Sequence, residues 1–254
     1  MFTPIDQVKW RQVKYLKEPL TASPEHAKYK YELVLPEPLA SWDVFDYWEK
    51  ERIASMEQHL KHGDVLYDIG TEQGWCNLVY ASIVGPENIV LVEPTPEFWP
   101  NIYYTWYRNF NDRPRGFYAG LFSDKTTDRL FNFKPNKWPE SILHDLIDRN
   151  KYQYIHANNQ NIPEIELDDY VAISTIIPDA ITMDVEGAEL LVLRGAKFTL
   201  ETYKPKCWIS IHPDLGERDY GILANQTIKF MTDLGYKAEF LAEDHECHYF
   251  FHAS

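Results

Sequence analysis

Acidic side chains and a histidine stand where short apolar runs of this 254-residue sequence end. Asp68 opens the segment Asp-Ile-Gly-Thr-Glu-Gln-Gly-Trp, whose glycines allow a sharp turn and a close approach of the backbone to a ligand. Glu93 follows Gly74 by about 20 residues, the spacing of the acidic residue that binds ribose hydroxyls in nucleotide-binding βαβ units. The pattern predicts a site for a ligand that contains a nucleoside.

Two further junctions carry groups that could move a proton. Asp184 and Glu186 follow the apolar run 180–183, and His212 follows the run 207–211. If both runs are parallel strands, their carboxyl ends meet at one edge of a sheet, where ligands of open α/β folds bind. We therefore expect Asp184 or His212 to act as a general base, with Glu186 orienting the base or the acceptor.

Short apolar runs alternate with helical stretches through most of the chain. The predicted strands are 65–67, 89–92, 116–120, 180–183 and 207–211, and the predicted helices are 41–61, 74–84, 96–110, 187–203 and 221–234. This alternation predicts an α/β fold with a mostly parallel sheet and helices on both of its faces. The runs 236–241 and 247–252 are joined by a segment too short for a crossover helix, so they should pair antiparallel at the sheet edge.

Two segments do not follow this alternation of predicted strands and helices. Residues 1–40, rich in Lys, Pro and Tyr, predict an extended arm with short helical pieces, and residues 41–254 form the main domain. Residues 134–162 are an insertion on the acceptor side, since a long excursion inside a compact domain is usually functional. The candidate substrate-binding residues are Tyr154, His156, Asn158 and His212.

Charge and composition exclude several classes of protein. The sequence has 25 Lys and Arg against 39 Asp and Glu, a formal net charge of −14, which disfavours nucleic acids and anionic membranes as partners. Its 3 cysteines are far apart, which excludes a disulfide scaffold and suits a reducing compartment. Since we find no secretory leader and no apolar stretch of spanning length, we expect a cytoplasmic protein without membrane insertion.

Together these segments resemble the FkbM-type family of S-adenosylmethionine-dependent O-methyltransferases. The segment 184–196, D-V-E-G-A-E-L-L-V-L-R-G-A, is similar to the signature of that family. Segments 65–75, 92–97, 121–124 and 167–170 match it in the same order. The resemblance implies a Rossmann-like class I methyltransferase fold with a seven-stranded sheet, and S-adenosyl-L-methionine as cofactor.

The resemblance also implies how the cofactor is held. Asp68, Gly70 and Gly74 would cradle the methionine part, Glu93 would hold the ribose, and the backbone near Gly120 would meet the adenine. The full cofactor set is Asp68, Gly70, Thr71, Glu72, Gly74, Trp75, Glu93, Pro94, Gly120, Leu121 and Asp184. The family usually has Ala-Asn in place of Thr71-Glu72, and a Glu on the fifth strand in place of Ser210.

The predicted function is therefore methyl transfer from S-adenosylmethionine to a hydroxyl of a small molecule or glycan, with a sugar as the first choice. One alternative is a methyltransferase-like domain that binds without turnover. Another is an NAD-dependent oxidoreductase, which the missing middle glycine of G-x-G-x-x-G disfavours. No residue is assigned to a metal: His245, Cys247 and His248 are expected at the sheet edge, away from the site. Mg²⁺ held by Asp184 and Asp214 is the lesser alternative. The oligomeric state stays open, a homodimer included.

Overall fold

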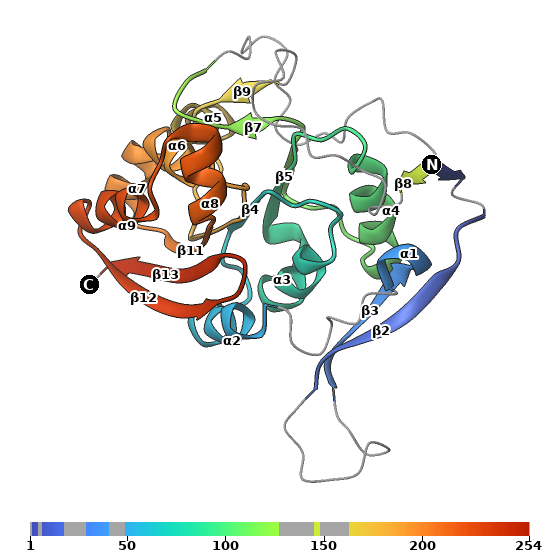
Figure 1. Ribbon diagram of the computed structural model, residues 1–254. Helices are drawn as coiled ribbons and strands as arrows, with labels where there is room; N and C mark the ends of the chain where they lie inside the picture. Colours follow the sequence, from blue (N-terminus) through green and yellow to red (C-terminus); the bar gives the residue numbers. More distant parts are fainter. Residues whose placement is uncertain are drawn as a thin grey trace.

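The structure, a computed structural model, describes residues 2–4, 7–17, 29–40, 49–126, 145–147 and 163–253. A sheet with the strand order β12-β13-β11-β10-β4-β5-β6 forms the centre of this part of the chain (Figure 1). Its strands are β4 (Leu66–Ile69), β5 (Ile89–Val92), β6 (Gly116–Tyr118), β10 (Ala180–Met183), β11 (Lys206–Ile211), β12 (Tyr236–Glu243) and β13 (Cys247–Ala253). The predicted α/β class and the seven-stranded sheet are confirmed.

The direction of each strand follows from the length of its connections. The five neighbouring strands β6, β5, β4, β10 and β11 are parallel to one another. In contrast, β13 runs antiparallel to both β11 and β12. The short segment between β12 and β13 leaves no room for a crossover, so the chain reverses into a hairpin at the sheet edge. Three smaller two-stranded pairs are β1 (Phe2–Pro4) with β8 (Asp145–Ile147), β2 (Trp10–Lys17) with β3 (Tyr29–Pro36), and β7 (Leu121–Phe122) with β9 (Glu164–Ile165).

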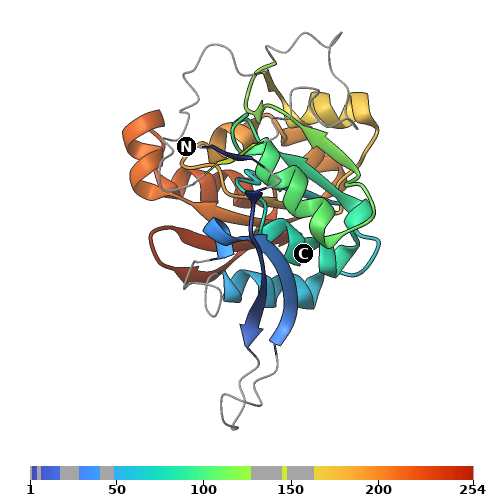
Figure 2. The same ribbon diagram turned by 90° about the vertical axis from the view of Figure 1, so that its right-hand side faces the viewer.

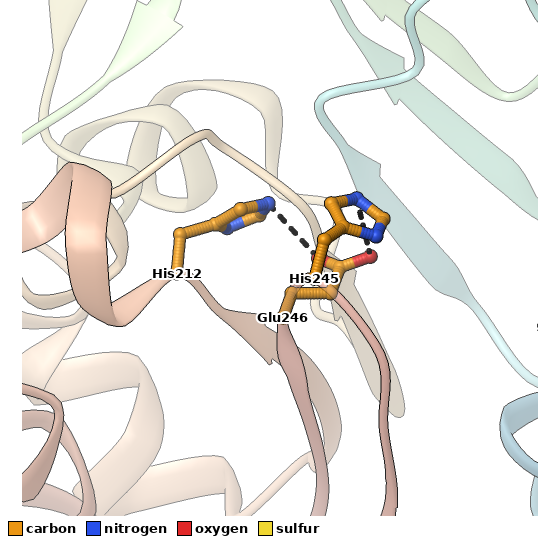
Figure 3. Close-up of side chains that lie close together, drawn as sticks. All are labelled: His212, His245 and Glu246. Atoms are coloured by element: carbon orange, nitrogen blue, oxygen red, sulfur yellow. Dashed lines mark ion pairs between the residues drawn. The ribbon is translucent and has the colours of Figure 1, made fainter.

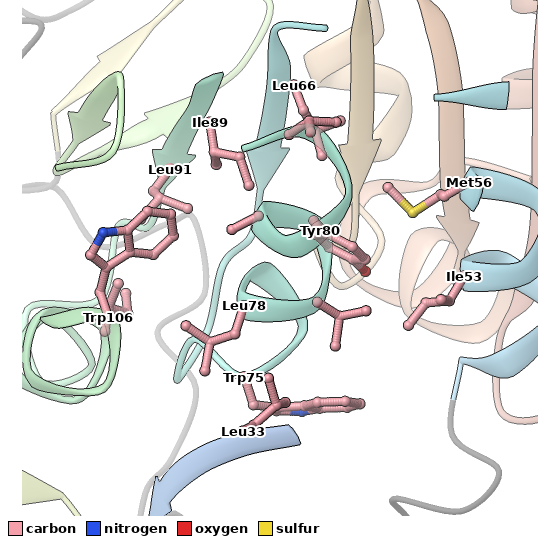
Figure 4. Packing of buried hydrophobic residues seen from close by; sticks show 14 of the residues in the cluster. Leu33, Ile53, Met56, Leu66, Trp75, Leu78, Tyr80, Ile89, Leu91 and Trp106 are labelled. Atoms are coloured by element: carbon pink, nitrogen blue, oxygen red, sulfur yellow. The ribbon is translucent and has the colours of Figure 1, made fainter. Parts of the chain in front are cut away.

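The central strands are apolar on both faces because helices cover both. The four residues of β5, Ile-Val-Leu-Val, are all buried, as expected for an inner parallel strand. Residues of α2 (Lys50–His59), α3 (Cys76–Val84) and α4 (Trp99–Asn109) form the core on one face (Figure 4). Residues of α5 (Leu167–Ser174), α6 (Glu189–Arg194), α7 (Lys197–Tyr203) and α9 (Ala224–Asp233) contribute to the core on the other.

Some helix boundaries differ from those predicted. The predicted helix 187–203 is two helices, because the chain bends at Gly195, where an added Cβ would lie only 1.8 Å from the carbonyl oxygen of Ser123. The predicted helix 221–234 starts later, at Ala224, after α8 (Pro213–Leu215) and a π-helical turn over Gly216–Tyr220. A 3-10 turn over Pro86–Asn88 precedes β5.

The N-terminal residues contribute to the core. The extended arm predicted for 1–40 is seen as β2 and β3 paired in a hairpin, followed by α1 (Glu37–Ala40) (Figure 2). Tyr15 of β2 and Leu33 of β3 are buried in the same cluster as Trp75. The domain boundary at residue 41 stays a prediction, but this hairpin packs against the main domain. None of the described helices has the length and apolar character needed to cross a membrane.

Candidate active site

The register of the parallel strands places the predicted acidic residues at one edge of the sheet. Ile69, at the end of β4, pairs with Val92 of β5 on one side and with Met183 of β10 on the other. Backbone hydrogen bonds extend this pairing past the strand ends, since the Asp184 N–H donates to the Ile69 carbonyl at 3.0 Å. Asp68, Glu93 and Asp184 therefore share the carboxyl edge, where ligands of such sheets bind. We call this edge the mouth.

The loop after β4 requires glycine at Gly70. This residue has φ of +87°, and a Cβ on it would lie 1.7 Å from the carbonyl oxygen of Asp184. The loops that follow β4 and β10 are thus in direct backbone contact, which no residue with a side chain permits.

A hydrogen-bonded carboxylate joins the loops after β4 and β5. Glu93 is 4% exposed, and its two oxygens accept the backbone N–H groups of Glu72 and Thr95, both at 2.8 Å. Burial raises the pKa of Glu93 to about 8, although the same backbone donors lower it in part. The carboxylate therefore lies at the loop position where an acidic residue binds ribose hydroxyls in related sheets.

Several buried polar atoms near this loop have no hydrogen-bond partner among the described residues. They are Asp68 Oδ2, Gln73 Nε2 and both amide atoms of Asn77. Burial raises the pKa of Asp68 to about 7, against the opposing effects of Thr71 and Arg52. Because an unpartnered buried polar atom is costly, these positions fit a ligand that brings both an ammonium and a carboxylate.

The residues expected to move a proton do come together. His212, at the end of β11, is 4% exposed, and its Nε2 lies 3.6 Å from Asp184 Oδ1 and 3.8 Å from Glu186 Oε2. Its Nδ1 lies 2.9 Å from Glu189 Oε1, and Glu189 also accepts the N–H of Gly187 at 3.0 Å. Glu189, which fixes the orientation of the imidazole, is not among the residues predicted from the sequence.

The expectation that the β12–β13 turn lies away from the mouth is wrong. Since β13 runs antiparallel to β11, with Cys247 beside Ile211, the turn before β13 reaches the carboxyl end of β11. Glu246 Oε2 lies 3.0 Å from His212 Nε2, and the rings of His212 and His245 are 6.2 Å apart (Figure 3). Figure 3 shows the Glu246 carboxylate between the two histidines.

Charge pairing sets the protonation of this cluster. Burial lowers the pKa of His212, but the carboxylates of Glu189 and Glu246 outweigh it and raise the pKa to about 11. Burial raises the pKa of Glu246, but its pairing with His212 outweighs this and brings the pKa to about 2. For Asp184, burial and then the Glu246 carboxylate raise the pKa above its usual range.

A buried arginine supports the mouth from α2. Arg52 donates to Glu49 Oε2 at 3.0 Å, to the carbonyl oxygen of Met183 at 3.0 Å and to Ser210 Oγ at 2.9 Å. The serine on the fifth parallel strand thus accepts a hydrogen bond from this guanidinium. Glu246 of the hairpin also places a buried carboxylate beside the end of this strand.

The other predicted cofactor residues take varied positions. Thr71 Oγ1 donates to the carbonyl oxygen of Asp68 at 3.1 Å and accepts the Val92 N–H at 3.2 Å, so it holds the loop to β5. Trp75 is 3% exposed and packs in the core, and the Leu121 N–H already donates to the carbonyl oxygen of Pro163. Pro94 is half-buried beside Glu93, and Gly120 directly precedes β7. The predicted acceptor residues Tyr154, His156 and Asn158 lie outside the described residues.

Comparison with known proteins bears on this site. A family model for the methyltransferase FkbM domain matches residues 68–238. No curated protein sequence matches the chain. Among solved structures, an FkbM methyltransferase from Methylobacillus flagellatus is 18% identical, with a TM-score of 0.50 over 81% of this chain and 46% of that chain. This chain thus spans less than half the length of that relative.

Two other solved structures are similar to this chain at lower TM-scores. A precorrin-6y C5,15-methyltransferase from Geobacter metallireducens is 12% identical, with a TM-score of 0.45 over 81% of this chain and 87% of that chain. A putative rRNA methylase from Clostridium thermocellum is also 12% identical, with a TM-score of 0.47 over 80% and 94%.

The residues present fit the cofactor that this family uses. Asp68, Gln73 and Asn77 offer unpartnered groups to an amino-acid moiety, Gly70 lets the loops after β4 and β10 meet at the mouth, and Glu93 offers a carboxylate to ribose. The family match covers more than half of the sequence and includes both the glycine loop and the Asp184 segment. The chain therefore belongs to the FkbM methyltransferase family, whose cofactor is S-adenosyl-L-methionine.

Proposed function

We propose that the protein transfers the methyl group of S-adenosylmethionine to a hydroxyl group of a small molecule or glycan, with a sugar hydroxyl as the acceptor. The observation that carries this proposal is the meeting of Asp184, Glu186 and His212 beside the glycine loop. Carboxylates side by side can accept hydrogen bonds from neighbouring hydroxyl groups, which suits a polyol.

Exposure supports Asp184 as the general base. Its side chain is 38% exposed, and that of Glu186 is 48% exposed, so both can reach an acceptor at the mouth. His212 is 4% exposed, and both of its ring nitrogens face buried carboxylates, those of Glu189 and Glu246. His212 therefore orients its neighbours, and Asp184 accepts the hydroxyl proton.

The bound cofactor supplies a methyl group activated by its sulfonium. The chain's own contribution is to place the acceptor oxygen in line with that group and to remove its proton. Glu186 and His212 orient the acceptor hydroxyl. Asp184 would take its proton as the new O–C bond forms and the S–C bond to the methyl group breaks, which leaves S-adenosylhomocysteine. Alignment supplies a large part of the rate, and a base adds about 10²–10⁴-fold.

The test is transfer of a labelled methyl group to a panel of mono- and oligosaccharides, followed by mass spectrometry of the products. We expect methylated sugar, and a loss of about 10²–10⁴-fold in kcat for Asp184→Asn measured at saturating S-adenosylmethionine. Asp124→Asn, an exposed carboxylate paired with Arg194, is the matched control.

Calorimetry separates the alternatives. Binding of S-adenosylhomocysteine without transfer to any hydroxyl acceptor would favour a binding domain without turnover. Binding of NAD instead of S-adenosylhomocysteine would favour an oxidoreductase and contradict the proposal.

A further inference from the structure

Two histidines at the mouth have the same arrangement of partners. His212 places Nδ1 2.9 Å from Glu189 Oε1 and Nε2 3.0 Å from Glu246 Oε2. His245 places Nδ1 2.9 Å from Asp244 Oδ1 and Nε2 3.7 Å from Glu246 Oε1. Each imidazole thus has one nitrogen next to its own carboxylate, Glu189 for His212 and Asp244 for His245. The other nitrogen of each ring pairs with the shared carboxylate of Glu246 (Figure 3).

This arrangement is the one that metal-binding histidines adopt. A ligating imidazole usually donates its second ring N–H to a carboxylate, which fixes the tautomer and the ring orientation. Glu189, 2% exposed, and Asp244 occupy that outer position for His212 and His245. The repeat of the pattern in two histidines from different elements is what distinguishes it from a single ion pair.

The donor spacing suits a shared ion. Ligand atoms of His212, His245 and Glu246 all lie within 4.8 Å of one another. Two ligands about 2.1 Å from a common ion, at tetrahedral or octahedral angles, are about 3.0–3.5 Å apart. The 3.0 Å between His212 Nε2 and Glu246 Oε2 is already in this range. His245 is the exposed member of the group, with 57% of its side chain exposed.

A second observation points to a missing ligand at the same place. The side chain of Glu246 is 1% exposed, and its Oε2 forms no hydrogen bond with any described residue, although it faces His212. Asp184 Oδ1 and Glu186 Oε2 approach the same nitrogen at 3.6 and 3.8 Å. Three carboxylates therefore converge on His212 Nε2, and a divalent cation that replaces the imidazole proton there would balance their charge.

We propose that His212, His245 and Glu246, with Asp184 as a further ligand, bind a divalent first-row transition-metal ion at the mouth. Imidazole nitrogen combined with carboxylate oxygen suits Mn²⁺ and Zn²⁺. Mg²⁺ strongly prefers oxygen ligands, so it binds this set more weakly. The site can be occupied whether or not the protein transfers methyl groups.

The ion would also have a role in the reaction, and this role rests on the proposed function. An ion beside Asp184 would contact the acceptor hydroxyl and lower its pKa, so that the proton passes more readily to the base. The test below uses the metal ion alone, and its failure would leave methyl transfer to a sugar standing.

The experiment is titration of the chelator-treated 254-residue protein with Mn²⁺, monitored by electron paramagnetic resonance, and with Zn²⁺, monitored by calorimetry. We expect one saturable site for each ion and weaker competition by Mg²⁺. Glu246→Gln should abolish the site, and His245→Ala should weaken it at least tenfold. Glu189→Gln, which alters only the outer partner of His212, should weaken it about 10–100-fold.

Folding and specificity need their own controls. His245 is largely exposed, so His245→Ala should keep the circular dichroism spectrum and melting temperature of the parent protein. His252, which pairs with Glu239 at 2.8 Å on the same hairpin, is the matched control, and His252→Ala should leave metal binding unchanged. Absence of saturable binding of either ion would overturn the proposal. The proposal would also be overturned if Glu246→Gln and His245→Ala both bound the metal as tightly as His252→Ala. The cluster would then be an ion-pair network only.

Discussion

The backbone N–H of Glu72 donates a 2.8 Å hydrogen bond to the buried carboxylate of Glu93. This bond joins the loop after β4 to the loop after β5, the two loops expected to hold the methionine and ribose parts of the cofactor. Because the pKa of Glu93 is raised to about 8 by burial, its charge changes near neutral pH.

Cofactor affinity should therefore depend on pH. An ionised carboxylate is the better acceptor for ribose hydroxyls, so binding of S-adenosylhomocysteine should tighten as pH rises from 6 to about 8 and then level off. Calorimetry across this range should also show release of a proton on binding. Glu93→Gln should bind more weakly, with that part of the pH dependence removed; an unchanged profile in this variant would refute the assignment.

The stability of the folded protein should decrease with rising pH, whereas cofactor affinity increases. Between the ordinary pKa of Glu93, 4.5, and about 8, the folded protein holds a proton that the unfolded chain has lost. The contribution of this residue to the free energy of unfolding therefore falls as pH rises through that window. Urea unfolding of the parent protein and of Glu93→Gln at pH 5 and pH 8 measures it. The expected result is a smaller decline between the two pH values in the variant.

Gly70→Ala should damage both the fold and the mouth. A Cβ there would lie 1.7 Å from the Asp184 carbonyl oxygen, so the loop after β10 must move. We expect a larger stability loss than the about 1–2 kcal/mol of a positive φ alone, together with loss of S-adenosylhomocysteine binding. Gly63→Ala, also at positive φ but with no atom within 4 Å, is the matched control. Equal losses in the two variants would show that the close contact does not matter.

Arg52→Leu should be strongly destabilising. The substitution leaves the Glu49 carboxylate, 3% exposed, buried without its partner and removes the donors to Met183 and Ser210. Loss of one partner of a buried pair costs about 3–5 kcal/mol, which urea unfolding would measure. Arg194→Leu, which breaks an exposed 3.9 Å pair with Asp124, should cost about 1 kcal/mol or less. Similar midpoints for the two variants would contradict this account of Arg52.

Asn77→Ala should separate binding from stability. The buried Asn77 amide has no hydrogen-bond partner among the described residues, so removing it should leave the melting temperature unchanged or raise it. Affinity for S-adenosylhomocysteine should fall by roughly tenfold, about the contribution of one hydrogen bond.

Asn109→Ala should lower stability without affecting cofactor binding. Its amide binds both the N–H and the carbonyl group of Val34, each at 2.8 Å, and so joins α4 to the N-terminal hairpin. We expect a lower melting temperature with unchanged cofactor affinity. A lower melting temperature in Asn77→Ala as well would mean that its amide is structural.

The elements that local pattern controls could be predicted from the sequence. The run Ile-Val-Leu-Val reads as a strand because an inner parallel strand is buried on both faces, and β5 has those bounds. The short link before Cys247 predicts the hairpin by its length alone. Asp68, Glu93 and Asp184 could be placed together because parallel strands align their carboxyl ends.

The contacts that depend on the packing of distant segments could not be predicted. Glu246 reaches His212 only because β13 pairs with β11 in one register, which the sequence of the turn does not specify. Arg52 bonds with Ser210 across 158 positions of the chain, and nothing in its helix marks it as a support of the mouth. Gly195 separates α6 from α7 because the Ser123 backbone packs against it, a contact that helical periodicity does not reveal.

Trp75 follows the cofactor loop directly, and its ring meets that of Tyr15 edge-on at 5.4 Å. The core beneath the loop after β4 is thus built in part from β2, well ahead of the span 68–238 that the family model matches. A version trimmed to that span would expose an indole that is now covered, and it should aggregate or lose affinity even with every ligand-contacting residue intact. The span matched by the family model is therefore shorter than the part of the chain that packs as one folded unit.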